Sequence, residues 1–204
     1  MNEFDDLERA LRRNAAAATE EPLPELDTAA AAAGLLDVVY ATLDSPVGQL
    51  LVAATPRGLV RIAYLDQAGE APVLEQLAAR ISPRVLAAPR RVDEPRRELD
   101  EYFSRRRHQF DLPIDWSLTR GFGRRVLRAT ARIPYGEVSS YKQVAAAAGS
   151  PRGSRAAGNA LGVNPMPIVV PCHRVLHAGG GLGGYTGGVE RKRLLLDVER
   201  RPTS

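Results

Sequence analysis

Apolar and polar residues first follow a pattern of short runs that is typical of β-strands. Three β-rich runs, at residues 38–43, 50–54 and 59–64, are separated by turns that contain proline and glycine. This spacing predicts a three-stranded antiparallel meander. Two segments with helical spacing follow, so we expect a small α/β unit. Its predicted helices are defined by Val73, Leu74, Leu77 and Ile81 and by Leu99, Tyr102 and Phe103.

The second half of the chain has a helical pattern. A first helix is predicted from an apolar face made of Phe122, Val126, Thr130 and Ile133. Ser140, three residues before Gln143, is typical of a capping box at the start of a second helix that ends at Gly149. We expect a third helix with Pro151 at its first position, running to about Leu161. Two short helices joined by a glycine-containing turn predict a helix-turn-helix.

Residues 1–35 differ from the rest because they are rich in alanine and acidic residues and have few large apolar side chains. We expect a flexible N-terminal extension there. The predicted organisation is therefore this extension, an α/β scaffold domain at residues 36–112 and a helical domain at residues 113–204. The predicted fold class is α+β.

Composition excludes several classes of protein. The single cysteine among 204 residues excludes an internal disulfide and any zinc site with two or more thiolates. No run approaches the roughly 20 apolar residues that span a bilayer, and the N-terminus is acidic where a signal peptide is basic. We expect a cytoplasmic protein that holds no metal and contacts no membrane.

Charge is distributed unevenly along the chain. Residues 1–35 carry 3 basic and 8 acidic side chains, residues 36–115 carry 11 and 12, and residues 116–204 carry 14 and 4. The last part, with a net charge of +10, favours a polyanionic partner such as nucleic acid. The alternative is general arginine richness, because 26 of the 28 basic residues are arginine.

The second helix of the helix-turn-helix, which contains residues 155–162, is made mostly of small residues. Helices that read the major groove usually carry long polar side chains. The pattern therefore leaves two alternatives open: close approach to the minor groove, or tight packing on another helix.

Cys172 is followed by His173 and Arg174 and lies upstream of a glycine-rich loop at residues 179–188. A lone cysteine is more often a small buried apolar residue than a nucleophile. Two potential cations beside it predict a lowered thiol pKa and a reactive thiolate. The loop is flexible enough to wrap a ligand pocket.

The chain resembles the O6-alkylguanine-DNA alkyltransferases over about residues 37–200. The segments that carry the resemblance are Pro171–Val175, Ile133–Tyr141, Arg155–Gly158, Asn164–Pro165 and Gly184–Gly188. It implies a ribonuclease H-like first domain and a helix-turn-helix that enters the minor groove. It also implies repair of double-stranded DNA that contains O6-alkylguanine, by irreversible alkyl transfer to cysteine after base flipping.

By resemblance, Cys172 is the nucleophile and Tyr141 faces ring N3 of the leaving guanine. His173 takes the thiol proton through a water, Glu199 holds the imidazole, and Asn164 is a hydrogen-bonding hinge. Asp197 is the nearest competitor for the carboxylate role. The implied DNA-binding residues are Arg155, which fills the gap left by the flipped base, with Ala156, Ala157, Gly158 and Tyr141. The implied pocket residues are Pro167, Val175, Tyr185, Thr186 and Gly187.

The resemblance implies that no cofactor activates the alkyl group, and we expect a monomer. Activity on O4-alkylthymine and cooperative binding to DNA stay open, and His108, His177 and residues 191–193 receive no role. Two alternatives compete: a non-catalytic DNA-binding module that senses alkylation damage, and a cysteine hydrolase built on Cys172, His173 and Glu199. The presence of the cysteine argues against the first. The helix-turn-helix has no evident purpose in the second.

Overall fold

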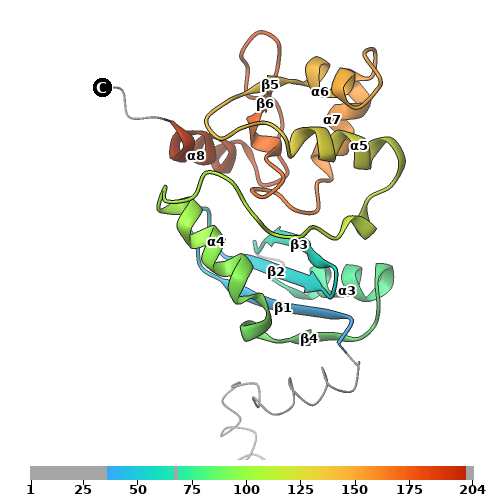
Figure 1. The fold of residues 1–204 in the computed structure, drawn as a ribbon, viewed down its shortest axis with the longest axis vertical. Coiled ribbons are helices and arrows are strands. Elements are labelled where there is room, and N and C mark those ends of the chain that lie inside the picture. The colour runs from blue at the N-terminus through green and yellow to red at the C-terminus, as the bar shows by residue number, and fades with distance from the viewer. Residues whose placement is uncertain (1–35, 67–68, 201–204) are drawn as a thin grey trace, which may run out of the picture. The chain divides into compact units, whose positions relative to one another are not determined.

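A four-stranded sheet forms the first part of the fold (Figure 1). The computed structural model describes residues 36–66 and 69–200, so the predicted extension at residues 1–35 lies outside the described residues. The predicted antiparallel meander is confirmed. The sheet order is β3-β2-β1-β4, and its strands are β1 (Val38–Leu43), β2 (Leu50–Thr55), β3 (Gly58–Tyr64) and β4 (Val85–Ala87).

The fourth strand, β4, was not predicted and pairs in parallel with β1. It has three residues and lies between Pro83 and Pro89. A run of this length is too short to show the alternation that identifies a strand, and the flanking prolines are typical of loops. The sheet is therefore mixed, because the other pairs are antiparallel.

The two predicted helices, α3 (Ala71–Arg80) and α4 (Asp93–Phe103), pack on opposite faces of the sheet. Side chains alternate along β2, so that Leu51 belongs to the same apolar cluster as Leu77 of α3. Its neighbour Leu50 belongs to the cluster that contains Leu99 of α4. Figure 1 shows α4 crossing in front of the strands. The second cluster continues into the helical part of the chain, which therefore shares one core with the sheet.

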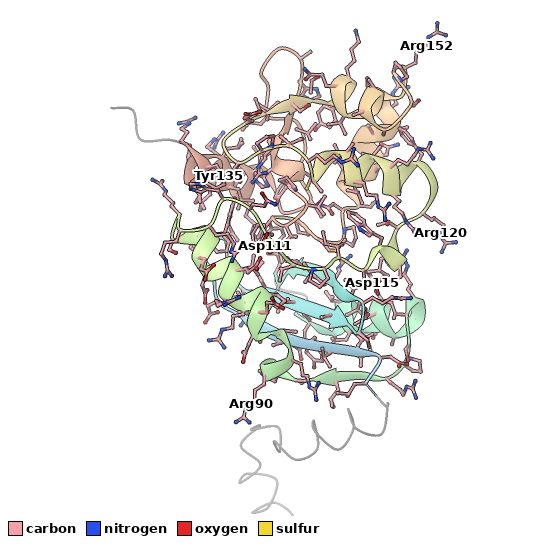
Figure 2. The ribbon with its side chains drawn as sticks, viewed as in Figure 1. Arg90, Asp111, Asp115, Arg120, Tyr135 and Arg152 are labelled. Atoms are coloured by element: carbon pink, nitrogen blue, oxygen red, sulfur yellow. The ribbon has the colours of Figure 1, made fainter. Side chains whose placement is uncertain are left out.

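The second part is helical and confirms the α+β class. Its helices are α5 (Gly121–Thr130), α6 (Tyr141–Ala147), α7 (Ser154–Gly162) and α8 (Val189–Glu199). Two-residue strands β5 (Ser139–Ser140) and β6 (Val175–Leu176) pair in parallel. Short 3-10 turns are η1 (Pro89–Val92), η2 (Trp116–Leu118) and η3 (Cys172–Arg174). Arginines such as Arg120 and Arg152 extend outward from this part (Figure 2).

Helices α6 and α7 form the predicted helix-turn-helix. The capping box is confirmed, because Gln143 N–H donates to Ser140 Oγ at 3.2 Å and Gln143 Oε1 accepts from Ser140 N–H at 2.8 Å. The predicted start of α7 at Pro151 is wrong, since the helix begins at Ser154. Residues 150–153 instead form a turn closed by a hydrogen bond from Gly153 N–H to Ser150 O at 2.8 Å.

The outer strand β3 joins the two parts of the fold. Leu59 N–H donates to Pro113 O at 2.8 Å, and Ile62 N–H donates to Pro165 O at 2.8 Å. Gly58 has φ +123°, and a Cβ there would lie 2.2 Å from Pro113 O, so this close approach requires glycine. These bonds cover the strand edge and hold the segment before Cys172 against the sheet.

Candidate active site

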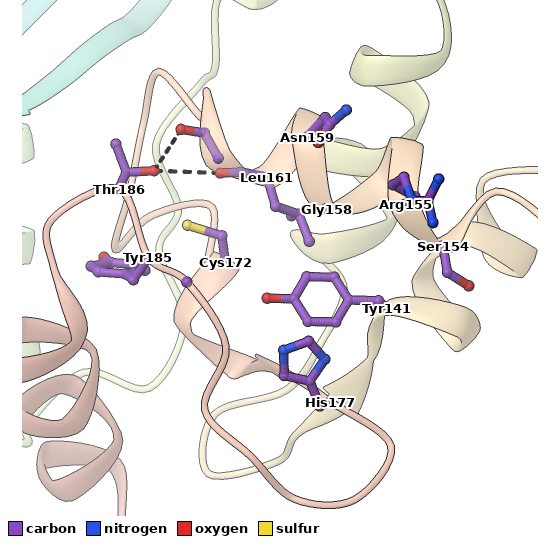
Figure 3. A pocket seen from close by; sticks show the side chains of 12 residues that line it. Tyr141, Ser154, Arg155, Gly158, Asn159, Leu161, Cys172, His177, Tyr185 and Thr186 are labelled. Atoms are coloured by element: carbon purple, nitrogen blue, oxygen red, sulfur yellow. Dashed lines mark hydrogen bonds between the residues drawn. The ribbon is translucent and has the colours of Figure 1, made fainter.

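A pocket of about 520 Å³ opens in the helical part beside Cys172 (Figure 3). Its wall is formed by the helix-turn-helix on one side and the glycine-rich loop on the other. The lining residues are Tyr141, Ser154, Arg155, Gly158, Asn159, Leu161, Gly162, Cys172, His177, Gly184, Tyr185 and Thr186. Cys172 is 5% exposed, so the thiol is reached mainly through this pocket.

The segment that carries Cys172 is buried and conformationally constrained. Residues 164–175 are all buried. Ile168 has φ +74°, a left-handed conformation that is unusual for a β-branched residue. Such strain persists only where the surrounding packing fixes the backbone. The chain then enters η3, which places the thiol toward the pocket and the next two side chains toward the interior.

Asn164 connects the end of α7 to the cysteine. Its Nδ2 donates to Val170 O at 2.8 Å and to Cys172 Sγ at 3.1 Å, and its Oδ1 accepts from Met166 N–H at 3.0 Å. The side chain is 3% exposed. One amide therefore holds both the sulfur and the backbone on either side of the strained residue.

The expectation that neighbouring cations lower the thiol pKa is wrong. Burial raises the pKa of Cys172 to about 11, and the hydrogen bond from Asn164 and the charge of Lys192 offset only part of this rise. His173 does not supply a cation, because burial lowers its pKa and disfavours the imidazolium. The guanidinium of Arg174 instead forms an ion pair with the Glu199 carboxylate. Residues two positions apart along the chain therefore need not share an environment.

His173 is buried and pairs with Glu199. Its Nε2 lies 2.8 Å from Glu199 Oε1, whereas the described residues offer no hydrogen-bond partner to its Nδ1. The carboxylate is ionised, since its hydrogen bonds lower the pKa of Glu199 to about 2. We assign the ring proton to Nε2, which leaves the Nδ1 lone pair free to accept a proton.

Glu199 accepts four further hydrogen bonds. Arg174 donates from Nε to Oε2 at 2.8 Å and from Nη2 to Oε1 at 2.9 Å, and Gly136 N–H donates to Oε2 at 3.3 Å. Tyr102 of α4 donates its hydroxyl to Oε1 at 2.7 Å. These contacts compensate for the burial of the charge. Asp197, the alternative carboxylate, instead pairs with exposed Arg200 at 3.2 Å.

Tyr141 begins α6 and extends into the pocket. Figure 3 shows its hydroxyl directed toward the side of the pocket that holds Cys172. Burial raises its pKa, so the phenol keeps its proton and can donate a hydrogen bond. His177, for which no role was predicted, lies beside it, with the ring centroids 5.2 Å apart.

Helix α7 presents a small-residue face. Arg155 and Ala156 are exposed, and no described residue pairs with the Arg155 guanidinium. Ala157, expected to bind DNA, is instead fully buried, because it faces the core together with Leu161. One face of the helix therefore packs inward, and the other face is open.

The predicted substrate-pocket residues divide into two groups. Tyr185 and Thr186 line the pocket, and Thr186 Oγ1 donates to Gly162 O at 3.1 Å, which ties the loop to the end of α7. Pro167, Val175 and Gly187 do not line it. Pro167 and Val175 are buried within the segment around the cysteine.

Gly187 has a packing function at the sheet. A Cβ on Gly187 would lie 2.5 Å from the ring of Tyr64 in β3. The hydroxyls of Tyr64 and Tyr185 are 2.7 Å apart, and either can donate. The glycine thus permits a tyrosine of the sheet to contact a tyrosine of the pocket.

The basic run at residues 191–193 is mostly structural. Arg191 donates to Val47 O at 2.7 Å and pairs with Asp66 at 2.7 Å. Lys192 is fully buried and donates to the carbonyls of Val175, at 2.7 Å, and Leu182. Only Arg193 is exposed, with Glu190 as its partner. A buried lysine in a helix of charged residues gives no signal in the sequence.

His108 makes an aromatic contact, and the described residues contain no candidate metal site. The rings of His108 and Tyr135 stack with centroids 4.3 Å apart. Within residues 36–66 and 69–200, no cluster of three or more His, Cys, Asp or Glu side chains is arranged to hold a metal ion. None of the helices in these same ranges is long and apolar enough to span a bilayer.

Comparison with known proteins extends over both parts of the fold. The family model for the ribonuclease-like domain of 6-O-methylguanine DNA methyltransferase matches residues 38–116, and that for its DNA-binding domain matches residues 121–201. A methylated-DNA–protein-cysteine methyltransferase of Mycolicibacterium paratuberculosis is 42% identical over 166 residues, which are 80% of this chain and 93% of the relative. The protein of that name from Rattus norvegicus is 37% identical over 80% of this chain and 83% of its own length.

Solved structures agree with these relatives. The crystal structure of the O6-methylguanine methyltransferase of Mycobacterium tuberculosis has a TM-score of 0.69 and 38% identity, covering 82% of this chain and 96% of that one. A crystal structure of OGT from the same organism in complex with DNA has a TM-score of 0.67 and 37% identity, covering 79% and 92%. The chain therefore belongs to the 6-O-methylguanine DNA methyltransferase family.

Proposed function

We propose that this protein removes alkyl groups from O6-alkylguanine in double-stranded DNA and transfers them, once per molecule, to Cys172. Family membership supplies the partner and the reaction class, which is DNA repair by alkyl transfer to a cysteine. Cys172 is the one cysteine of the sequence. The observation that carries the assignment is its environment: a pocket-facing thiol that accepts a hydrogen bond from Asn164 and is followed by the His173–Glu199 pair.

The transfer is a direct displacement. The Cys172 sulfur attacks the alkyl carbon, so a sulfur–carbon bond forms while the bond from that carbon to guanine O6 breaks. The electron pair of the broken bond stays on guanine, which regains a proton on its ring. Tyr141 supports the departing base by donating a hydrogen bond to ring N3. Because a thioether is not readily reversed, the protein is consumed by one reaction.

A base is needed because burial keeps the Cys172 thiol protonated near neutral pH. His173 suits this role, since it is held neutral by burial and its Nδ1 has no partner among the described residues. The thiol proton passes to Nδ1 through a water, and the Glu199 carboxylate stabilises the resulting imidazolium from the other side of the ring. Cys172, His173 and Glu199 thus act as nucleophile, base and orienting carboxylate.

DNA contacts the open face of α7 in the minor groove. Ala156 is exposed on this face and Gly158 lines the pocket, so the helix backbone can approach closely. The target base must leave the stack to reach a thiol at the end of the pocket. Arg155, at the pocket rim and unpaired among the described residues, fills the gap that the base leaves.

We propose O6-alkylguanine as the main substrate, with O4-alkylthymine as a second substrate to be tested. A monomeric state and a cytoplasmic location stay predictions. The division of the chain into a scaffold domain at residues 36–112 and a reactive domain at residues 113–204 also stays a prediction.

The proposal is tested by incubating the protein with duplex DNA that carries a radiolabelled methyl group on guanine O6. We expect label to move to the protein and unmodified guanine to appear in the DNA, whereas Cys172→Ser should bind the same DNA without accepting label. Binding without transfer by the unaltered protein would instead indicate a damage-sensing module. Label released as free methanol would indicate a hydrolase.

A further inference from the structure

The sheet part of the protein reaches the buried network behind Cys172 through one hydroxyl. Tyr102 lies in α4, 97 residues before Glu199 in the chain, and donates to Glu199 Oε1 at 2.7 Å. The same oxygen accepts from His173 Nε2 at 2.8 Å. Tyr102 and His173 are fully buried, and Glu199 is 2% exposed, so water does not compete for this oxygen.

The ring of Tyr102 is fixed by aromatic neighbours. Phe103 and Phe110 lie with ring centroids 5.3 and 5.4 Å away, and Tyr135 lies edge-on at 6.1 Å. A packed ring leaves the phenolic oxygen one direction, toward the carboxylate. Packing alone would be served equally well by phenylalanine, whose ring fills the same space. The hydroxyl therefore has a purpose separate from the apolar core.

We propose that Tyr102 is a positioning residue of the alkyl-transfer site, whose hydroxyl holds Glu199 Oε1 against His173 and so orients the imidazole toward the thiol. This inference rests on the proposed function of Cys172. Oε1 accepts three hydrogen bonds, from Tyr102, His173 and Arg174, and their directions together determine where it lies. The α/β part thus contributes a group to the chemistry as well as a scaffold.

Removing the hydroxyl has two consequences with defined signs. The carboxylate loses one of its fixed contacts, so the imidazole is oriented less well and transfer becomes slower. The hydroxyl also stabilises the negative charge on Oε1 by donating a hydrogen bond to it. Without it, more of that charge is available to the imidazolium, so the pKa of His173 rises. The low-pH limb of the rate profile, where His173 becomes protonated, should then move to higher pH.

The other charged or titratable groups around His173 stay in place in this experiment. Glu199 and Arg174 raise and lower its pKa respectively, and Lys192 lowers it. The Tyr185 ring lies edge-on with its centroid 6.5 Å from that of His173. Among the described residues, the groups of this kind placed around His173 are Tyr102 from α4 through Glu199, Glu199 and Lys192 from α8, Tyr185 from the loop, and Cys172 and Arg174 from its own segment.

The test compares Tyr102→Phe with Tyr135→Phe in the full-length protein. Tyr135 is a matched control, because its hydroxyl donates to the backbone carbonyl of Val198 at 2.9 Å, next to Glu199 in α8, without contacting the carboxylate. Its place beside α8 is labelled in Figure 2. Single-turnover transfer from O6-methylguanine duplex is measured across pH, and the His173 imidazole is titrated by ¹⁵N NMR without DNA.

We expect Tyr102→Phe to slow transfer about tenfold and to move both the low-pH limb and the His173 titration upward by about half a pH unit. Tyr135→Phe should leave both titrations at the wild-type position. The inference is overturned if Tyr102→Phe matches wild type in rate and titration, or if both variants change alike. A wild-type protein that accepts no methyl group would overturn the proposed function instead, while the NMR titration would still test the link between Tyr102 and His173.

Discussion

The Asn164 side-chain amide donates to the Cys172 sulfur at 3.1 Å and to the Val170 carbonyl at 2.8 Å. One buried group therefore joins the reactive atom to the backbone that delivers it. Asn164 lies two residues after Gly162, the last residue of α7. The backbone carbonyl of its neighbour Pro165 accepts a hydrogen bond from Ile62 N–H in β3. Helix α7, the cysteine and the sheet therefore meet at this residue.

Asn164→Ala should slow alkyl transfer about 10- to 100-fold, because the thiolate that forms during reaction loses a hydrogen-bond donor in a buried site. Asn164→Asp should be slower still, since it keeps an acceptor for Met166 N–H but places a negative charge beside the sulfur. Single-turnover rates with O6-methylguanine duplex measure this, with thermal unfolding to confirm that both variants fold. Rates within twofold of wild type would show that the contact does not assist the reaction.

Glu199 makes stability depend on pH in the acid range. Its pKa falls from 4.5 to about 2 on folding, so the unfolded chain binds the proton more readily. The stabilisation is fully present above pH 4.5 and is lost as pH falls toward about 2. His173 contributes a separate loss of stability. Burial lowers its pKa below 6.5 in the folded state, so stability also falls as pH decreases below 6.5. Urea unfolding at stepwise pH should show stability falling through this window.

Glu199→Gln should remove the part of that slope below pH 4.5 and lower the free energy of unfolding at pH 7 by about 3–5 kcal/mol, because buried Arg174 loses its counter-charge. Glu190→Gln is the matched control, since Glu190 lies in the same helix with its side chain 86% exposed. An acid slope that is the same in all three proteins would contradict the assignment of the slope to Glu199.

Two glycines of the same loop should respond differently to alanine. Gly187→Ala places a Cβ 2.5 Å from the Tyr64 ring, so we expect a loss of about 1–3 kcal/mol in unfolding free energy. At Gly184 no described atom lies within 4 Å of an added Cβ, and alanine there should change stability little. Thermal and urea unfolding of the two variants check this. Equal effects would mean that contact with Tyr64 is not what requires glycine at position 187.

Arg155→Ala should weaken repair of duplex DNA far more than reaction with the free O6-alkylguanine base, because only the duplex must be opened, at a cost of a few kcal/mol. Arg152→Ala is the control: it removes an exposed arginine from the turn before α7 that does not line the pocket. The ratio of the rate with duplex DNA to the rate with the free base should fall in Arg155→Ala and stay at the wild-type value in Arg152→Ala. Parallel losses on both substrates would remove the gap-filling role.

Much of the architecture could be predicted from local sequence patterns. The three long strands, the capping box of Ser140 and the helix-turn-helix follow from spacing within a few residues, and all are found in the structure. Strand β4 and the start of α7 escaped prediction because three residues carry no period, and because Pro151 suits a turn as well as a first helical position.

The site was predictable only in part. Family resemblance named Asn164, Cys172, His173 and Glu199, and the structure pairs Asn164 with Cys172 and His173 with Glu199. The direction of the thiol pKa was mistaken because burial, the dominant cause, is a property of the folded chain. The contacts of Tyr102 with Glu199 and of Tyr64 with Tyr185 span 97 and 121 residues, and no local signal announces them.

The central claim, that Cys172 is the acceptor of a single irreversible transfer, is tested most directly by intact-mass spectrometry with a peptide map. The protein is incubated with a large excess of duplex DNA that contains O6-methylguanine. We predict a mass increase of one methyl group per molecule, located on the peptide that contains Cys172, with no further turnover. Repeated turnover, or a methyl group on any other residue, would contradict the account.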